Sequence, residues 1–258
     1  KKKYGKRAYH IMPETFILEN RKNMNEFKKF YEKRKKSNVN CKFILKNYKQ
    51  RQEGLKLVNN MKDIKEGVKN DFKIVQDYIE NPYIINKRKI NLRYYLLVVC
   101  HYGKIGGWIY KDGFVYYTPK SFVKYSMDFN RNITTGYIDR KVYDENPLTL
   151  EDFRIHIGEE KSKLWDKEVQ TKMNKIMISL AGQICSDSKL SKHIKFQIFG
   201  VDVAPSNRLK ATIMEINKGP DIGFKDDRDG HVKKNMVRGA FNIIEPIDDE
   251  DTGYKRIY

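Results

Sequence analysis

Residues 196–220, FQIFGVDVAPSNRLKATIMEINKGP, contain two apolar stretches joined by a short polar segment that includes a proline. The first stretch carries Asp202, and the second carries Glu215 and Asn217. Alternate residues of a strand point to the same face of a sheet, so Glu215 and Asn217 share a face, and Ile213 should share it too. The polar segment predicts a turn, and antiparallel pairing of the two strands should therefore place Asp202 near Glu215.

These side chains form a hard oxygen site. Mg²⁺ prefers carboxylate and amide oxygens and takes its other ligands from water and nucleotide phosphates. We therefore predict that Asp202, Glu215 and Asn217 hold Mg²⁺. The alternative is that the two carboxylates are ion-pair partners of the abundant lysines.

Charge limits the classes of partner. The 258 residues include 52 Lys and Arg against 33 Asp and Glu, a formal net charge of +19. A field of this sign favours nucleotides, acidic peptides, nucleic acids or anionic membranes, and by itself does not choose among them. No apolar run reaches the roughly 18 residues that a bilayer requires, so no membrane partner is expected.

The three cysteines, Cys41, Cys100 and Cys185, are odd in number, far apart and without metal-ligand spacing. Each has apolar neighbours. We predict three buried, reduced thiols and therefore a reducing, cytoplasmic compartment.

Hydrophobic periodicity predicts helices and strands intermixed along the chain. Helices are expected at 23–36, 61–68, 150–186 and 231–244, and strands at 41–46, 72–79, 90–100, 196–204 and 209–217. A turn followed by a strand is expected at 51–58. Lys111-Asp112-Gly113 predicts a hairpin within 106–118. The inward stripe of the long helical segment should contain Leu164, Val169, Met173, Ile176, Leu180 and Ile184. Hairpin connections between strands favour an α+β fold over a doubly wound parallel sheet.

The strand pair resembles a signature of the tubulin tyrosine ligase-like family, a branch of the ATP-grasp superfamily. That signature is F-x-[LI]-[FY]-G-x-D, a hairpin, then L-K-x-x-[LI]-[LI]-E-x-N-x-x-P. It is matched by Phe196, Gly200, Asp202, Leu209, Lys210, Glu215, Asn217 and Pro220. Further family-like segments precede it in the expected order: IMPETFIL at 11–18, FILK at 43–46, IVQDYIENPYII at 74–85, KINLRYYLLV at 89–98 and NITTGYI at 132–138.

The resemblance covers about residues 11 to 243 and implies a divergent member that lacks the family's N-terminal domain. It implies an ATP-grasp fold, in which two α+β lobes grip ATP between antiparallel sheets. Residues 1–85 would form the central lobe, with the nucleotide-binding lysine strand, the phosphate loop and the hinge. Residues 86–258 would form the C-terminal lobe, with the metal and substrate site. A monomer is expected.

The resemblance also implies roles for matched residues. Lys46, Arg93 and Glu215 would be catalytic, with the two cations neutralising phosphate charge. An arginine in so apolar a strand needs a partner, which independently favours a functional Arg93. ATP would be bound by Lys46, Gly54, Gln76, Asp77, Tyr78, Ile79, Lys89, Asn91, Thr134 and Asp202, with Thr135 as a further candidate.

The implied reaction is ATP- and Mg²⁺-dependent ligation through an acyl-phosphate. A free amino acid would be joined to a carboxylate of an acidic protein tail, such as that of tubulin, by glutamylation, glycylation or tyrosination. Positioning and electrostatics would supply most of the catalysis. Phosphoryl transfer of the kinase type is not favoured, because the chain has no H-R-D motif.

Several positions depart from the family pattern. The phosphate loop keeps only Gly54 of the expected glycines, Asn91 replaces an acidic residue, Tyr116 stands roughly where the family has an arginine, and Lys218 adds a cation. These changes leave open a catalytically degenerate nucleotide-binding module, or a basic module that binds microtubules or nucleic acid. Of these macromolecular partners, we expect an acidic protein rather than nucleic acid.

Overall fold

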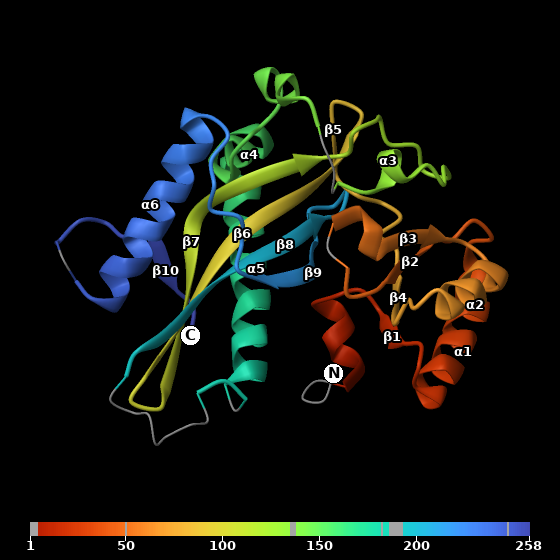
Figure 1. The fold of residues 1–258 in the computed structure, drawn as a ribbon. Coiled ribbons are helices and arrows are strands. Elements are labelled where there is room, and N and C mark those ends of the chain that lie inside the picture. The colour runs from red at the N-terminus through yellow and green to blue at the C-terminus, as the bar shows by residue number, and fades with distance from the viewer. Residues whose placement is uncertain (1–4, 50, 135–137, 182, 186–192, 247) are drawn as a thin grey trace.

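The computed structural model describes residues 5–49, 51–134, 138–181, 183–185, 193–246 and 248–258. Two antiparallel sheets, each covered by helices, lie next to each other (Figure 1). The predicted α+β class, with antiparallel sheets in two lobes, is confirmed. Within the described residues, no helix has the length and apolar character needed to cross a membrane.

The smaller sheet and its two helices form a unit that we call the small lobe. Its strand order is β1-β4-β2-β3, with bounds Thr15–Ile17, Ile74–Asp77, Phe43–Lys46 and Leu55–Val58. Helices α1 (Arg21–Ser37) and α2 (Met61–Lys69) begin at the capping residues Asn20 and Asn60. Both helices bury apolar residues in one cluster with Phe43 and Leu45, so they cover the same face of the sheet.

The larger sheet and its helices form the large lobe. Its strand order is β10-β7-β6-β8-β9, with β5 also paired to β6. The bounds are β5 Ile84–Ile85, β6 Arg88–His101, β7 Lys104–Tyr117, β8 Lys195–Pro205, β9 Ala211–Lys218 and β10 Tyr254–Arg256. Helices α4 (Leu150–Ile157) and α5 (Glu159–Leu180) cover one face, and α6 (Asp227–Ile244) covers the other.

Strand β6 is buried on both faces, as its continuous apolar sequence predicts. Tyr94 and Leu96 pack in the cluster with α4 and α5, whereas Leu97 packs in the cluster with α6. The central position of β6 brings its polar residues, which lie near its start, between its neighbours β7 and β8.

Short segments complete the chain. They are η1 Gly5–His10, η2 Arg51–Gly54, α3 Phe129–Asn132 and η3 Arg140–Asp144. Ile11, directly after η1, packs in the core of the large lobe, and its carbonyl accepts a hydrogen bond from the Ile213 amide at 2.8 Å. The proposed lobe boundary between residues 85 and 86 stays a prediction, because this N-terminal segment contacts the far lobe.

The predicted Asp-Gly hairpin is wrong. Strand β7 runs through Asp112 and Gly113, and the turn that joins it to β6 lies at Tyr102 and Gly103, with φ angles of 48° and 70°. Two successive positive φ angles suit a tight hairpin turn. Gly113 is needed for another reason, since a Cβ there would lie 2.0 Å from the Arg93 carbonyl oxygen, beside a register shift in the β6–β7 pairing.

The predicted inward stripe of the long helical segment is partly wrong. Gly158, with φ 85°, separates two helices and changes their phase. The buried side of α5 carries Trp165, Val169, Met173 and Met177, spaced by four residues, while Leu164 is 70% exposed. Leu164 therefore lies on the solvent side.

The prediction of three reduced thiols is also wrong. Cys100 at the end of β6 forms a disulfide with Cys185, which follows α5, with a Cα–Cα distance of 5.7 Å. Cys41 is free and buried, as predicted. The two cysteines are 85 residues apart, so local sequence pattern does not predict their contact. The cysteines consequently give no support for a reducing compartment.

Candidate active site

The β8–β9 hairpin places the predicted carboxylates side by side. Asp202 pairs in register with Glu215, which confirms the predicted strand pairing. The expected position of Ile213 is wrong, because a bulge at Met214 shifts the register, and Ile213 pairs with Val203 in the hydrophobic core. The bulge lets core residues and site residues follow each other closely on one strand.

Arg93 on β6 holds Asp202 from the neighbouring strand. The two residues pair in register, and the guanidinium Nε and Nη2 donate to the two carboxylate oxygens at 2.6 and 3.1 Å. Burial raises the pKa of Asp202, and the charge of Arg93 opposes this effect. Gly200 leaves space for the guanidinium, since a Cβ there would lie 3.0 Å from Arg93 Nη1.

Glu215 connects this pair to the small lobe. Its Oε1 accepts a hydrogen bond from Asn217 Nδ2 at 2.8 Å, and its Oε2 lies 3.8 Å from Lys46 Nζ. Lys46 ends β2, so this ion pair joins the two sheets. Burial lowers the pKa of Lys46, while Glu215 and Asp202 oppose the shift. All five predicted catalytic and metal residues thus converge between the lobes.

Three oxygen-bearing side chains lie together at this point. Asn217 Nδ2 lies 2.8 Å from a Glu215 oxygen and 3.3 Å from an Asp202 oxygen, so one point is within reach of all three side chains. Rotation of the amide would present its oxygen instead. No group of three His, Cys, Asp or Glu residues within the described ranges could hold a metal. Any Mg²⁺ here would therefore use the amide, water or phosphates.

Lys89 and Tyr78, both predicted to bind ATP, belong to a buried polar cluster between the lobes. Lys89 Nζ donates to the Tyr78 hydroxyl at 3.2 Å and to the Asn132 carbonyl at 2.9 Å. Lys42, which is fully buried, donates to Asn132 Oδ1 at 2.8 Å and to the Lys124 carbonyl at 2.7 Å. The cluster therefore joins the residue directly before β2 and the residue directly after β4 in the small lobe to β6 and α3.

Burial dominates the ionisation of this cluster. It lowers the pKa of Lys89 to about 7, and the nearby Lys42 charge acts in the same direction. The sequence pattern does not single out Lys42, and it predicts no contact for Asn132. The available signal was a lysine inside the apolar run 41–45, but a lysine at a strand end is usually solvated.

The proposed hinge residues are placed unequally. Strand β4 lies between β1 and β2, so its backbone groups mostly serve the sheet. Gln76 is buried and donates to Thr15 Oγ1 at 3.0 Å, while Asp77 pairs with Arg34 of α1 at 3.1 Å. Asp77 thus points to the helix-covered face. Ile79 is half-buried beyond the strand end, and adenine contacts at this hinge stay a prediction.

The remaining predicted ATP residues have separate surroundings. Asn91 pairs in register with Tyr116, and its buried Oδ1 has no hydrogen-bond partner within the described residues. Thr134 is half-buried after α3, and Thr135 lies outside the described residues. Gly54 is buried, and a Cβ there would lie 2.0 Å from the Lys49 carbonyl oxygen. A glycine is therefore needed at position 54 because the backbone of the same loop passes close to it.

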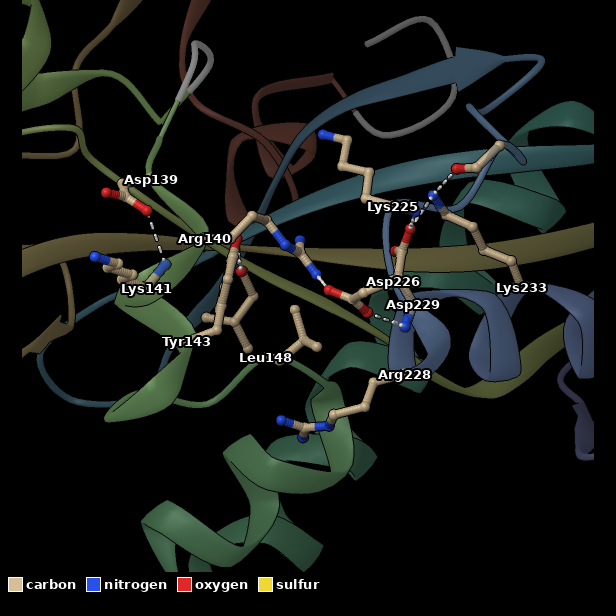
Figure 2. A network of polar contacts seen from close by, with 12 residues as sticks. Asp139, Arg140, Lys141, Tyr143, Leu148, Lys225, Asp226, Arg228, Asp229 and Lys233 are labelled. Carbon is tan, nitrogen blue, oxygen red and sulfur yellow. Dashed lines mark hydrogen bonds and ion pairs between the residues drawn. The ribbon is translucent and has the colours of Figure 1, made fainter.

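A polar network fixes the segment that follows β9 (Figure 2). Asp226 caps α6 by accepting from the Asp229 amide, and it also pairs with Arg140. The buried Asp229 accepts from the Lys225 amide at 2.8 Å and from Lys233 Nζ at 3.1 Å. These contacts anchor the start of α6, which residues 219–224 connect to the strand that presents Glu215 and Asn217.

The two facing antiparallel sheets, with a lysine of one against carboxylates of the other, define an ATP-grasp-like protein. A sequence model described as the Tubulin-tyrosine ligase family matches residues 1–252. The chain therefore belongs to the tubulin-tyrosine ligase family.

Curated relatives are similar at low identity. The chain is 27% identical over 192 residues to the probable tubulin polyglutamylase TTLL9 of Rattus norvegicus, covering 71% of this chain and 41% of that protein. It is 22% identical over 262 residues to a probable beta-tubulin polyglutamylase of Tetrahymena thermophila, covering 92% of this chain and 21% of that protein. It is 22% identical over 259 residues to the probable tubulin polyglutamylase TTLL2 of Homo sapiens, covering 93% of this chain and 42% of that protein. The chain thus spans less than half the length of each.

Proposed function

We propose that the chain is an ATP- and Mg²⁺-dependent ligase that joins a free amino acid to a carboxylate of an acidic protein tail. The carrying observation is the convergence of Lys46 from the small lobe with Arg93, Asp202, Glu215 and Asn217 from the large lobe. Family membership supports ligation, and the names of the relatives support a tubulin-type acceptor and glutamate as the amino acid.

In the proposed reaction, an acceptor carboxylate oxygen attacks the γ-phosphorus of ATP and ADP leaves. The donor amine then attacks the acyl carbon of the resulting acyl-phosphate, an amide forms, and phosphate and a proton leave. Both steps bring negative charges together. Preorganised cations lower the free energy of such an encounter.

Each side chain has a distinct part in this proposal. Arg93 uses Nε and Nη2 for Asp202, which fixes its plane and leaves Nη1 for a phosphoryl oxygen. Lys46 would hold phosphates from the opposite lobe. Mg²⁺, when bound by Asp202, Glu215 and Asn217, would neutralise charge between the phosphoryl groups. We propose a monomer that acts beside the cytoskeleton, as the tubulin acceptors named for the relatives suggest.

The test combines the chain, ATP, Mg²⁺, pooled acidic peptides and labelled amino acids. Acceptor-dependent ADP release and an amino-acid mass increment on a peptide are expected. Glu215→Gln should reduce the rate at least about 100-fold, because it removes a charged oxygen ligand that would hold Mg²⁺ at the reacting phosphates. The matched control, Glu160→Gln, changes an exposed glutamate of α5 and should keep the rate.

Other outcomes would contradict the proposal. Nucleotide binding without turnover in any mixture would favour the degenerate module instead. A phosphorylated peptide without an added amino acid would indicate a kinase. Turnover that survives both chelation of divalent ions and Glu215→Gln would show that this group is not the site.

A further inference from the structure

A second charged surface lies on the small lobe, away from the site. The apolar sides of α1 and α2 share one buried cluster, so the opposite side of each helix faces away from it. Figure 1 shows both helices on the same side of the small sheet. The exposed basic residues on them, which we call the lysine face, are Arg21, Lys22, Lys28, Lys29, Lys33, Lys36, Lys62, Lys65 and Lys69. The exposed acidic residues on the same helices are Glu26, Glu32 and Glu66.

This face is not neutralised by the chain itself. Its nine basic side chains have no carboxylate partner among the residues that the structure describes, and the ion pairs of Arg34 lie on the sheet side of α1. The small lobe also holds most of the excess charge. Residues 1–85 contain 22 Lys and Arg against 10 Asp and Glu, whereas residues 86–258 contain 30 against 23.

The lysine face and the candidate active site lie on opposite sides of the small sheet. Phe43 and Leu45 of β2 face the helices, so Ile44 and Lys46 face the other way by strand alternation. Lys46 meets Glu215 of the large lobe there. A peptide bound at the site would not cover the lysine face, and the face is therefore suited to a separate contact.

We propose that the lysine face docks an acidic surface on the folded body of the acceptor protein, outside the modified tail. Eight of its nine cations are lysines, flexible point charges that suit clustered carboxylates, whereas phosphate recognition favours the arginine fork. No exposed aromatic side chain lies on either helix, so bases have no stacking platform. This choice of partner rests on the proposed function; the binding itself does not require turnover.

Two consequences follow for the reaction. Attraction to an acidic body steers the encounter at long range and weakens with salt. A second contact also raises the effective concentration of the tail at the site. The lysine face should therefore matter for a complete acceptor protein and not for a short peptide.

The test measures binding of labelled poly-L-glutamate by fluorescence anisotropy at 50 and 200 mM salt. The triple variant Lys22→Gln, Lys29→Gln, Lys33→Gln removes three charges of the face and should weaken binding about tenfold at 50 mM salt. The control Lys161→Gln, Lys163→Gln, Lys167→Gln removes three exposed charges of α5 and should change affinity less than about twofold. Circular dichroism and thermal unfolding check that both variants fold.

Equal weakening in both variants would overturn the proposal, because net charge alone would then explain binding. Tighter binding of duplex RNA or of anionic vesicles, lost only in the lysine-face variant, would also overturn it. Turnover on a short acidic peptide separates this proposal from the proposed function. Unchanged peptide turnover with lost polyglutamate binding supports a separate docking face, while absent turnover in the unmodified chain contradicts only the ligase assignment.

Discussion

Lys89 is enclosed between the lobes, and among the described residues its ammonium group donates to two neutral oxygens, those of Tyr78 and Asn132. The surrounding charges are Lys42, which lowers its pKa, and Glu80, which raises it. Burial outweighs both, so the pKa is about 7 in the folded chain, against 10.5 for the exposed side chain. The unfolded chain consequently binds more protons than the folded chain between these two pH values.

Stability should therefore rise with pH in this window. Between pH 7 and 9, the free energy of unfolding is expected to increase by about 2 kcal/mol from Lys89. Tyr78 does not oppose this, because burial raises its pKa. Urea unfolding at pH 7, 8 and 9 measures the slope. Lys89→Met should flatten it, and the exposed Lys104→Met should not; equal slopes in all three proteins would contradict the prediction.

Helix α5 shows what decides the orientation of an element. A helical pattern is consistent with several apolar stripes, and the sheet selects one of them. Here Met173 is fully buried beneath the sheet, whereas Leu164, which the sequence pattern assigned to the core, is 70% exposed. The four-residue spacing of the buried set is visible only when the starting phase, set by Gly158, is known.

Replacing Met173 or Leu164 by alanine should show which side of α5 is buried. Met173→Ala should lower the free energy of unfolding by about 2–4 kcal/mol, because it opens a cavity between α5 and the sheet. Leu164→Ala should change it by less than about 0.5 kcal/mol. Chemical denaturation of both variants measures the difference. Similar losses in both would place Leu164 in the core after all.

At the scale of the whole molecule, the disulfide ties the end of the central strand β6 to the segment after α5. It closes a loop of 85 residues, which includes β7, α4 and α5. A cross-link over so long a segment restricts the unfolded chain strongly.

Removal of this bond should destabilise the large lobe. Cys185→Ser, or reduction of the intact chain, is expected to lower the free energy of unfolding by about 2–4 kcal/mol. The matched variant Cys41→Ala changes a buried cysteine that is not cross-linked. Reduction should lower the free energy of unfolding of this variant by the same amount as in the unmodified chain. Peptide mapping without reductant identifies the bond directly. A free Cys100 thiol in oxidised, folded protein would contradict the assignment.

Much of the fold and part of the site could be predicted from local pattern. The β8–β9 pairing of Asp202 with Glu215 follows from two apolar strands joined by the short connection 206–210, and β6 is recognisably central from its apolar length. The buried lysine cluster could not be predicted. Lys42 and Asn132 are 90 residues apart, and their contact depends on how α3 packs against the small sheet.

The sequence by itself determined the elements, the family resemblance and the polar residues that mark the hairpin, because these depend on neighbours within a few positions. Only the tertiary structure decided which lysine lies next to Glu215, which side of α5 is buried and which cysteines pair. It also decided that the bulge directs Ile213 into the hydrophobic core. Those outcomes depend on the relative placement of elements far apart in the chain. Local propensity does not predict that placement, because it is determined by packing between sheets and helices.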